Sequence, residues 1–533
     1  MKTVKFSILG ILLLSLVLPL SAAGGQQSAS GLADIGFNAS GLPIVSKPFT
    51  MSAAAWRRPM HAPFSEMESY KRMETRTGVH IQWIELPEAN FAERKNLMLA
   101  SNDLPDVFWS GSSDADILRY GYSGIFIPQE KLIEQYAPRL VKIFNDRPEV
   151  KKYVTTPDGH IYTLPVIMEL AHRVNPDNMF INKVWLDKLG LQMPNTYDEF
   201  YNVLKAFKDR DPNGNGLRDE IPMSFYGRDP GNSLDFSSLF AGFGMFAYGD
   251  FIMVSNGKVY FTGNTAEYRN ALVYFNRMYS VGLIDPEAFT HDVAQYSAKG
   301  QNPDILYGVF FDWFDENCVG NARAENDYVC LPPLLGIDGK RHWRYDPAAL
   351  LMRDVFAITS KMKNPEVATR WANECYDLDN SYELAYGAWG VNLRREGDRV
   401  IQIPPPPGLS ADEFRYLNAS STTPYMLDET AFRNLSLTNN HIRKFARLDI
   451  YRQYFPTLAE IYPRVFFLQE EETELSIIRT DIKDYLSQMR GKFIVGSESI
   501  STGWNAYVSA LNQMGLNRYL ELYQRALDRY NAN

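Results

Sequence analysis

A short stretch of the chain, Asp211-Pro-Asn-Gly-Asn-Gly-Leu-Arg-Asp-Glu220, carries oxygen-bearing side chains at alternate positions. A hard divalent cation such as Ca2+ prefers about six to eight oxygen ligands, and every second side chain of a tight loop can point inward. The stretch offers such ligands in the order of an EF-hand-type loop: Asp211, Asn213, Asn215, the Leu217 carbonyl and Asp219, with Gly216 at the sharp turn. We therefore predict a bound calcium ion, and the alternative is an Asn- and Gly-rich turn without a metal.

The end of this loop departs from an EF-hand. The position at which an EF-hand carries a bidentate glutamate is Pro222, and the nearest carboxylate belongs to Glu220. The loop is therefore expected to bind calcium without forming half of a paired helix–loop–helix sensor. Because it joins the end of a predicted helix to Ile221, away from the expected ligand cleft, we predict that the ion is structural.

Strand and helix patterns alternate in the part of the chain that precedes this loop. The predicted strands run from Phe49 to Ala53, Val79 to Ile84 and Asp106 to Trp109, and the predicted helices cover 66–77 and 91–100. This βαβ rhythm is typical of an α/β fold with a mostly parallel sheet. Ligands of such a sheet are expected at the carboxyl ends of its strands.

Several later helices have clear start and stop signals. Thr196 and Glu199 form a capping box before an apolar face of helical spacing, and this helix is expected to end where Asp211 begins the loop. A second helix is predicted from Thr265 to Gly282. The C-terminal region is predicted to be helical over 475–489, 504–514 and 516–530.

The composition narrows the classes of function. The 533 residues carry a net charge of −9, which argues against nucleic acid as a partner. Aromatic residues make up 13% of the chain, a content that is common in carbohydrate-binding proteins and also in ordinary cores. The only cysteines are Cys318, Cys330 and Cys375, so one bridge between Cys318 and Cys330 is possible, and buried free thiols are an equal alternative.

The N-terminus has the pattern of a secretory signal peptide over residues 1–23. Lys2 and Lys5 precede an apolar run, and Ser21-Ala-Ala23 offers small residues for cleavage. Residues 24–40 are rich in Gly, Ser and Ala and are predicted to be a flexible leader. Because no cysteine follows the apolar run, we expect a periplasmic or secreted protein without a lipid anchor.

Four stretches of the chain together resemble family 1 extracellular solute-binding proteins of bacterial ABC importers. The resemblance is to the subgroup that includes the alginate-binding and LplA-like lipoproteins. The stretches are Phe180 to Gly190 with Pro194 to Phe200, the loop from Asp211 to Pro222, Tyr279 to Pro286, and the C-terminal pattern Phe493-Ile-Val-Gly496, Trp504-Asn-Ala-Tyr507, Met514-Gly-Leu516, Tyr523 and Arg529. Their order and spacing are similar to the family over nearly the whole mature chain.

The resemblance implies a two-lobed periplasmic-binding-protein fold of the type II-like kind, with the ligand in a cleft between the lobes. Lobe one would comprise 40–165 and 352–425, and lobe two 166–351 and 426–533, with the calcium loop 211–220 in lobe two. In alginate-binding members a matching loop holds calcium through side chains at the positions of Asp211, Asn213, Asn215, Asp219 and Glu220 and one backbone carbonyl. The expected partners are an oligosaccharide and the membrane subunits of an ABC permease, and the chain is expected to be a monomer.

The candidate ligand residues follow predicted strands or match cleft positions of the family. Tryptophan offers a flat surface for a sugar ring, whereas Asp accepts and Arg donates hydrogen bonds with hydroxyl groups. The candidates are Trp56, Arg57, Arg58, Trp109, Ser110, Asp312, Trp313, Tyr386 and Trp389. Trp313 is the leading candidate; Trp109 and Trp389 could be core residues, and Arg57 and Arg58 could be surface charges. The paired arginines would suit an acidic sugar, and a neutral oligosaccharide is an equal alternative.

Two other functions are compatible with an exported, calcium-binding chain. A secreted calcium-dependent glycoside hydrolase would need a carboxylate pair across a cleft, for which Asp312 with Asp315 or Glu316 could be considered. A binding protein could also report to a membrane sensor kinase. The leading prediction is an oligosaccharide-binding protein of an ABC importer that works by hinge closure and has no catalytic residues.

Overall fold

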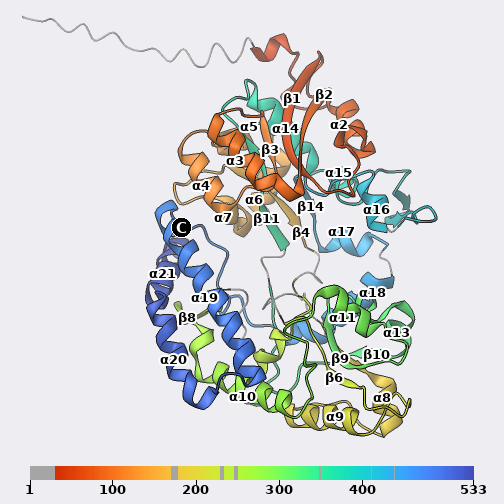
Figure 1. Ribbon diagram of the computed structural model, residues 1–533. Coiled ribbons are helices and arrows are strands. Elements are labelled where there is room, and N and C mark those ends of the chain that lie inside the picture. The colour runs from red at the N-terminus through yellow and green to blue at the C-terminus, as the bar shows by residue number, and fades with distance from the viewer. Residues whose placement is uncertain are drawn as a thin grey trace, which may run out of the picture.

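The computed structural model describes residues 31–169, 174, 178–227, 233–244, 250–346, 350–409, 411–436 and 439–532. These residues form two lobes, each built around its own sheet, and a set of C-terminal helices runs along one side of the second lobe (Figure 1). The predicted signal peptide lies outside the described residues. Within the described residues, no helix is both long enough and apolar enough to cross a membrane.

The first lobe contains a sheet of six strands. Its order is β14 (Tyr425–Leu427), β4 (Thr163–Met168), β11 (Leu351–Ile358), β3 (Val107–Trp109), β1 (Phe49–Arg57) and β2 (Val79–Pro87). β1 runs parallel to β2 and β3, and β14 runs parallel to β4, but β11 is antiparallel to both of its neighbours. The strand predictions for this lobe are confirmed, and β11 interrupts the predicted parallel order.

Helices cover both faces of the first sheet, as the βαβ pattern predicts. They are α2 (Glu68–Thr77), α3 (Phe91–Ser101), α4 (Asp114–Tyr122), α5 (Glu130–Tyr136), α6 (Pro138–Asp146), α7 (Pro148–Val154), α14 (Pro365–Cys375) and α15 (Leu378–Tyr386). α16 (Ala411–Tyr416) lies at the periphery of this lobe (Figure 1). A hairpin of β12 (Leu393–Glu396) and β13 (Arg399–Gln402) lies beside them. Residues 35–38 hydrogen-bond with the segment 43–47, so the ordered part of the chain begins before residue 40, the predicted end of the leader.

The second lobe contains a smaller sheet of four strands. Its order is β10 (Tyr328–Cys330), β5 (Asn178–Asn182), β9 (Tyr307–Asp312) and β6 (Ile221–Met223), and only β6 and β9 are parallel. A separate hairpin consists of β7 (Ile252–Ser255) and β8 (Lys258–Phe261). The mostly parallel sheet is predicted from strands of the first lobe, and the sheet of the second lobe is instead mostly antiparallel.

The helices of the second lobe include those with the clearest sequence signals. They are α8 (Lys183–Leu189), α9 (Tyr197–Asp209), α10 (Ala266–Ser280), α11 (Val293–Gly300), α12 (Asp315–Val319), α13 (Asn321–Asn326), α18 (Asn439–Tyr451), α19 (Gln469–Val495), α20 (Ile500–Gln513) and α21 (Leu516–Ala532). α17 (Glu429–Asn434) precedes α18 and packs on the first lobe, where Phe432 belongs to the same cluster as Val166 and Tyr382. The capping box at the start of α9 is formed, because the Thr196 side chain accepts from the Glu199 N–H and the Glu199 side chain accepts from the Thr196 N–H. α19 begins earlier than predicted, at Gln469, and Gly496 ends it in the left-handed conformation.

The antiparallel strands have a topological cause. β4 ends shortly before the chain passes to the second lobe and β5 begins on the other side, so β5 runs away from the first lobe. β11 begins where the chain returns, so it runs opposite to β4. The carboxyl ends of β1, β3, β4 and β14 therefore lie on the edge that faces the second lobe. By the same reasoning, the carboxyl ends of β6 and β9 face the first lobe.

Candidate functional site

The predicted calcium loop connects α9 to β6 at the edge of the second sheet that faces away from the first lobe. Gly216 adopts a left-handed conformation with φ of 79°, which gives the turn its sharpness. The Asp211 carboxylate accepts hydrogen bonds from the N–H groups of Gly214 at 2.9 Å and Gly216 at 3.1 Å. The side-chain amides of Asn213 and Asn215 each donate to the Asp219 carboxylate at 2.9 Å. Four of the five predicted side chains, those of Asp211, Asn213, Asn215 and Asp219, therefore bond to groups within the loop.

Glu220 is the most informative residue of this loop. Both of its carboxylate oxygens are buried, and among the described residues neither has a partner at good hydrogen-bond geometry, although the main-chain N–H groups of Asn213 and Glu220 lie near enough to lower its pKa. Burial raises the pKa of Glu220, and the nearby carboxylates of Asp211 and Asp219 raise it further. Three carboxylates that approach one another without a cation are unfavourable, and a buried carboxylate without a partner is costly. A divalent cation would relieve both penalties.

The donor set fits calcium, although the present side-chain arrangement is not a finished metal site. Within the described residues, no group of three or more His, Cys, Asp or Glu side chains is arranged to hold a metal. The amide nitrogens of Asn213 and Asn215 now face Asp219, so each amide would have to turn its oxygen inward. Asp211, Asn213, Asn215, Asp219 and Glu220, with the Leu217 carbonyl, would then supply the oxygen ligands that Ca2+ prefers.

At the carboxyl end of β1, Trp56 and Arg58 take part in a mixed aromatic and cationic cluster. The Arg58 guanidinium lies 4.8 Å from the centre of the Trp56 ring and donates to the Tyr416 hydroxyl at 3.2 Å. His61 packs on Tyr416 at 4.6 Å, and its buried Nε2 has no hydrogen-bond partner. Burial and the nearby arginines lower the pKa of His61 to about 4, so the ring is neutral at physiological pH. Trp56 and Arg58 thus lie on the edge that faces the second lobe, and sequence reasoning missed His61 and Tyr416.

Arg57 and Ser110 are used within the first lobe. Arg57 forms an ion pair with Glu85 at 2.8 Å and donates to the His61 carbonyl at 3.1 Å. The Ser110 hydroxyl is buried and donates to the Thr422 carbonyl at 2.5 Å. Both side chains support the cleft edge through these internal bonds, and Arg58 is likewise paired within the first lobe, with Glu88 at 3.2 Å. Trp56 is therefore the stronger ligand candidate at this edge.

The prediction that Trp109 binds the ligand is wrong. Its side chain is fully buried in the core of the first lobe. The ring contacts Trp83, Trp371 and Phe356, with ring centres 4.9, 4.7 and 5.5 Å away. A strand end reveals that a residue is near the cleft, but not which face of the sheet its side chain occupies.

We expect Trp109→Ala to destabilise the first lobe strongly. Removing a fully packed indole leaves a cavity and costs about 3–5 kcal/mol of unfolding free energy. Urea denaturation followed by tryptophan fluorescence would measure this loss. A change below about 1 kcal/mol, the range of a surface substitution, would show that Trp109 is not the core residue described here.

In the second lobe, Trp313 follows β9 at the edge that faces the first lobe. Its ring is half-buried, and the Lys444 ammonium of α18 lies 3.2 Å from the ring centre. Lys444 also donates to the Trp313 carbonyl at 2.9 Å, so it contacts both the ring and the main chain of Trp313. Asp312 is buried and accepts from the Phe314 N–H at 3.2 Å. Asp312 therefore supports the turn that carries Trp313 instead of offering an exposed oxygen, which corrects its predicted role.

The burial of Asp312 predicts a pH dependence of stability. Burial raises the pKa of Asp312 from 3.8 to about 7, and the main-chain donors of Phe314 and Trp313 only partly oppose it. Because the folded-state pKa exceeds the unfolded value, the carboxyl group favours folding most at low pH, and this contribution is lost as the pH rises from about 4 to about 7. Because asparagine does not titrate, we expect the free energy of unfolding of Asp312→Asn, relative to that of wild type, to rise by about 2 kcal/mol when the pH is raised from 5 to 8. Urea titrations of both proteins at the two pH values measure the difference, and a pH-independent difference would contradict this account.

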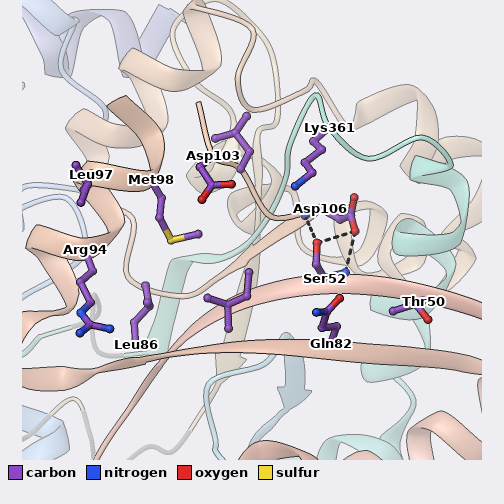
Figure 2. Close-up of a pocket in the computed structure, with 12 residues that line it drawn as sticks. Thr50, Ser52, Gln82, Leu86, Arg94, Leu97, Met98, Asp103, Asp106 and Lys361 are labelled. Carbon is purple, nitrogen blue, oxygen red and sulfur yellow. Dashed lines mark hydrogen bonds between the residues drawn. The ribbon is translucent and has the colours of Figure 1, made fainter. Parts of the chain in front are cut away.

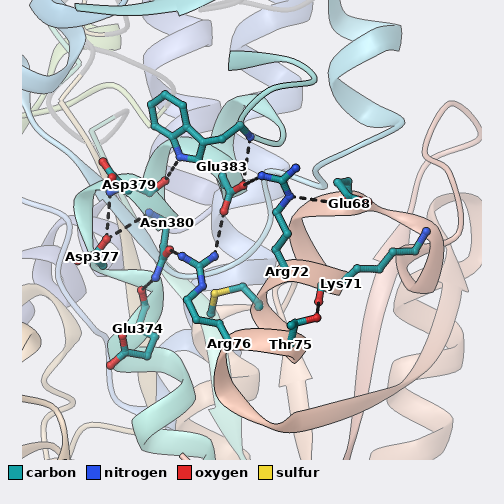
Figure 3. Close-up of polar contacts among 12 residues, drawn as sticks. Glu68, Lys71, Arg72, Thr75, Arg76, Glu374, Asp377, Asp379, Asn380 and Glu383 are labelled. Carbon is teal, nitrogen blue, oxygen red and sulfur yellow. Dashed lines mark hydrogen bonds and ion pairs between the residues drawn. The ribbon is translucent and has the colours of Figure 1, made fainter. Parts of the chain in front are cut away.

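Tyr386 and Trp389 lie at the end of α15, beside polar contacts that link α15 to α2. The Trp389 indole N–H donates to the Asp379 carbonyl at 3.1 Å, and its main-chain N–H donates to Glu383 at 3.1 Å. Figure 3 shows Arg72 and Arg76 of α2 converging on the same Glu383 carboxylate. Trp389 lines a hollow of about 550 Å³ between these helices, on the flank of the first lobe. The Tyr386 ring packs on Phe432 at 6.3 Å. These contacts make Trp389 a support of the α2–α15 junction.

A larger cavity, of about 940 Å³, is lined by both lobes and is called the inter-lobe cavity below. Its volume is in the range of small-molecule sites, about 300–1,000 Å³. Aromatic rings and charged groups both line its wall. They include Asp114, Tyr153 and Glu169 from the first lobe and Tyr345, Arg464 and Tyr523 from the second. None of the nine predicted ligand residues lines it. Sequence reasoning missed this cavity because its wall is assembled from segments that are far apart along the chain.

Another cavity, of about 830 Å³, lies wholly in the first lobe. Figure 2 shows it between α3 and the strands β1 and β2, with Asp106 bonded to Ser52 at its floor. Asp106 precedes β3, and Lys361 follows β11. Both therefore lie on the sheet edge opposite the second lobe, and this cavity is not part of the cleft.

The carboxylates considered for a hydrolase are held inside the second lobe. Asp315 is fully buried and forms an ion pair with Arg447 of α18. Glu316 pairs with Arg443 of the same helix at 3.1 Å. A catalytic pair must face the bond to be cleaved across a shared cleft. Asp315 and Glu316 instead tie α12 to α18.

Comparisons with known proteins agree with the two-lobed architecture. The sequence model of the bacterial extracellular solute-binding protein family matches residues 52–377. The fructooligosaccharide ABC transporter substrate-binding protein FusA of Streptococcus pneumoniae serotype 4 is 35% identical over the full length of both chains. Two FusA structures are similar to this chain: one contains kestose, and the other is an EF-hand mutant in complex with fructo-nystose. Each has a TM-score of 0.77 at 34% identity and covers 91% of this chain and 100% of FusA. Alginate-binding protein AlgQ2, in a crystal structure without calcium ion, has a TM-score of 0.69 at 25% identity and covers 92% of this chain and 100% of AlgQ2.

Proposed function

On the premise that this chain belongs to the bacterial extracellular solute-binding protein family, we propose that it captures an oligosaccharide outside the cytoplasm and delivers it to an ABC permease. The observation that carries this proposal is the inter-lobe cavity, whose wall of tyrosines and charged groups comes from both lobes. A ligand that contacts both lobes favours the closed arrangement over the open one. FusA, which is similar over its whole length, is named for fructooligosaccharide binding, so a fructooligosaccharide is the first ligand to test.

Calcium binding by the loop 211–220 is the second part of the proposal. Its support is the buried Glu220 carboxylate without a partner, close to Asp211 and Asp219. The EF-hand mutant of FusA and the calcium-free form of AlgQ2 indicate that similar proteins carry such loops. Because the loop lies on the edge of the second sheet that faces away from the first lobe, the ion would stabilise the second lobe rather than contact the ligand.

The remaining features of the proposal follow from the family. The chain would act as a free monomeric protein after removal of residues 1–23, in the periplasm or as a secreted protein. Its partners would be the oligosaccharide and the transmembrane subunits of the permease. It would bind its ligand without cleaving it, since Asp315 and Glu316 are held by arginines of α18.

Isothermal titration calorimetry tests the proposal. The mature protein, loaded with calcium, would be titrated with kestose and with maltotriose, a neutral trisaccharide of different linkage. We expect saturable binding of kestose and recovery of the intact sugar afterwards. If neither sugar binds saturably, the result contradicts oligosaccharide capture. Steady release of fructose would show that the protein is an enzyme.

A further inference from the structure

Residues 464–467, called the strap below, contribute buried side chains to the cores of both lobes through Val465, Phe466 and Phe467. The Phe466 side chain belongs to a cluster of the first lobe that includes Phe108 and Ile117. Its neighbours Val465 and Phe467 belong to the core of the second lobe. The strap therefore connects the two lobes in addition to the segments by which the chain passes between them, and it does so at the wall of the inter-lobe cavity.

Arg353 of β11 holds the strap in the first lobe. This buried side chain donates to the Val465 carbonyl at 3.1 Å, and its guanidinium lies 3.5 Å from the centre of the Phe466 ring. Asp114 balances the Arg353 charge through an ion pair, with one hydrogen bond at 2.8 Å. The backbone next to Arg464 is thus fixed by buried contacts, so the point on the cavity wall from which its side chain extends is set before any ligand arrives.

Arg464 itself is exposed and lines the inter-lobe cavity. Its guanidinium lies 5.9 Å from the Tyr153 ring centre. Among the contacts of the described residues, Arg464 forms neither a hydrogen bond nor an ion pair, whereas the other arginine of the cavity wall, Arg479, is paired with Glu472 at 3.1 Å. An arginine presents several N–H donors in a rigid plane, and those of Arg464 have no hydrogen-bond partner among the described residues.

The charge of the cavity wall separates two classes of sugar. Its lining acids are Asp114, Glu149, Glu169, Asp250, Asp346 and Glu472, and its lining cations are Arg464 and Arg479. Arg353, Arg147 and Lys483 pair with Asp114, Glu169 and Asp250 from outside this lining, so the acids exceed the cations by one. A uronate oligosaccharide would bring several more negative charges into this wall, at an electrostatic cost that a neutral sugar avoids. The acceptors that remain on the wall suit the hydroxyl groups of a neutral sugar.

We propose that the inter-lobe cavity selects a neutral oligosaccharide and that Arg464, positioned by the strap, donates hydrogen bonds to adjacent hydroxyl groups of one sugar unit. The half-buried Tyr345 ring, on the same cavity wall, provides an apolar surface for the sugar C–H face. This inference rests on the proposed function and adds the ligand's charge class and a residue that recognises it. Arg464 is a ligand contact, and Arg353 is a positioning residue that acts through the strap.

Calorimetric titrations of the calcium-loaded protein with kestose and with an alginate trisaccharide test this proposal. Wild type should bind kestose more tightly than the acidic trisaccharide. Arg464→Ala should weaken kestose binding about 10- to 100-fold, because a hydrogen bond from a charged donor is lost. Arg399→Ala is the matched control: Arg399 is exposed on β13 and has no hydrogen bond or ion pair among the described residues, so the affinity should not change. Arg464→Gln, which keeps most of the side-chain length, replaces the alanine variant if that variant does not fold.

The outcomes separate this proposal from the proposed function. If wild type binds neither sugar, the proposed function fails and this inference fails with it. If wild type binds kestose while Arg464→Ala and Arg464→Gln bind it equally well, Arg464 is not a ligand contact and only this inference is overturned. If the alginate trisaccharide binds more tightly than kestose, the cavity does not select neutral oligosaccharides, and that part of the proposal is overturned.

Discussion

Removal of calcium should lower the melting temperature of the protein by about 5–10 °C. An ion that binds only the native state adds RT ln(1+[L]/Kd), or about 2.7 kcal/mol when its concentration is 100 times Kd. For domains of this size, each kcal/mol corresponds to about 2–4 °C. The physical cause is local: without the ion, the buried Glu220 carboxylate has no partner and faces the charges of Asp211 and Asp219. Differential scanning fluorimetry in excess calcium and in excess EDTA measures the shift.

Variants of the loop make this test specific. Asp219→Asn removes a carboxylate that the loop would use, so its melting temperature should no longer respond to EDTA. Asp209→Asn is the matched control, because Asp209 is exposed at the end of α9, pairs with Lys205 and lies just outside the loop. It should respond to EDTA as wild type does. Identical melting curves of the wild-type protein with and without calcium would show that the loop is a turn without a metal.

Trp313→Ala should weaken oligosaccharide binding about 10- to 50-fold with little change in melting temperature. The ring is half-buried on the edge of the second lobe that faces the first, outside the lining of the inter-lobe cavity. The expected loss of affinity therefore requires the oligosaccharide to extend from that cavity to Trp313. Covering such an apolar surface with a sugar face is worth on the order of 2 kcal/mol, which corresponds to this change in Kd. Loss of the ring should also free Lys444 from its position over it. Calorimetry with kestose measures the affinity, and fluorimetry measures the melting temperature.

Two other tryptophans serve as controls for this experiment. Trp504 is also half-buried, but it packs on Phe493 and Tyr507 among the C-terminal helices, so Trp504→Ala should retain the affinity for kestose. Trp109→Ala should show the opposite pattern to Trp313→Ala, with a large loss of stability. Unchanged kestose affinity in Trp313→Ala would remove Trp313 from the binding site.

Local signals in the sequence predicted the local structure well. The capping box of Thr196 and Glu199 places the start of α9, because the two side chains satisfy N–H groups that no other part of the helix can reach. The positions of Asp211, Asn213, Asn215 and Asp219 predict a loop whose polar groups converge, since their spacing acts within a few residues. Gly78 ends α2, the helix predicted over 66–77, for the same reason, whereas α19 runs beyond its predicted end at 489 to Val495.

Features that depend on distant segments could not be predicted in this way. The directions of β5 and β11 follow from the passage of the chain between lobes, which no local pattern records. Trp109 and Trp313 both follow strand patterns, and only the packed structure shows that the first is core and the second is half-buried at the cleft edge. The inter-lobe cavity combines Asp114, Tyr153 and Arg464, which come together only through the tertiary fold.

Small-angle X-ray scattering with and without saturating kestose tests most directly whether an oligosaccharide is held between the two lobes. A sugar that contacts both lobes favours their closure, so the radius of gyration should fall when kestose binds. The same measurement with maltotriose controls for the effect of sugar on the solvent. A radius of gyration that stays the same while calorimetry shows kestose bound would contradict capture between the lobes and would place the sugar on one lobe alone.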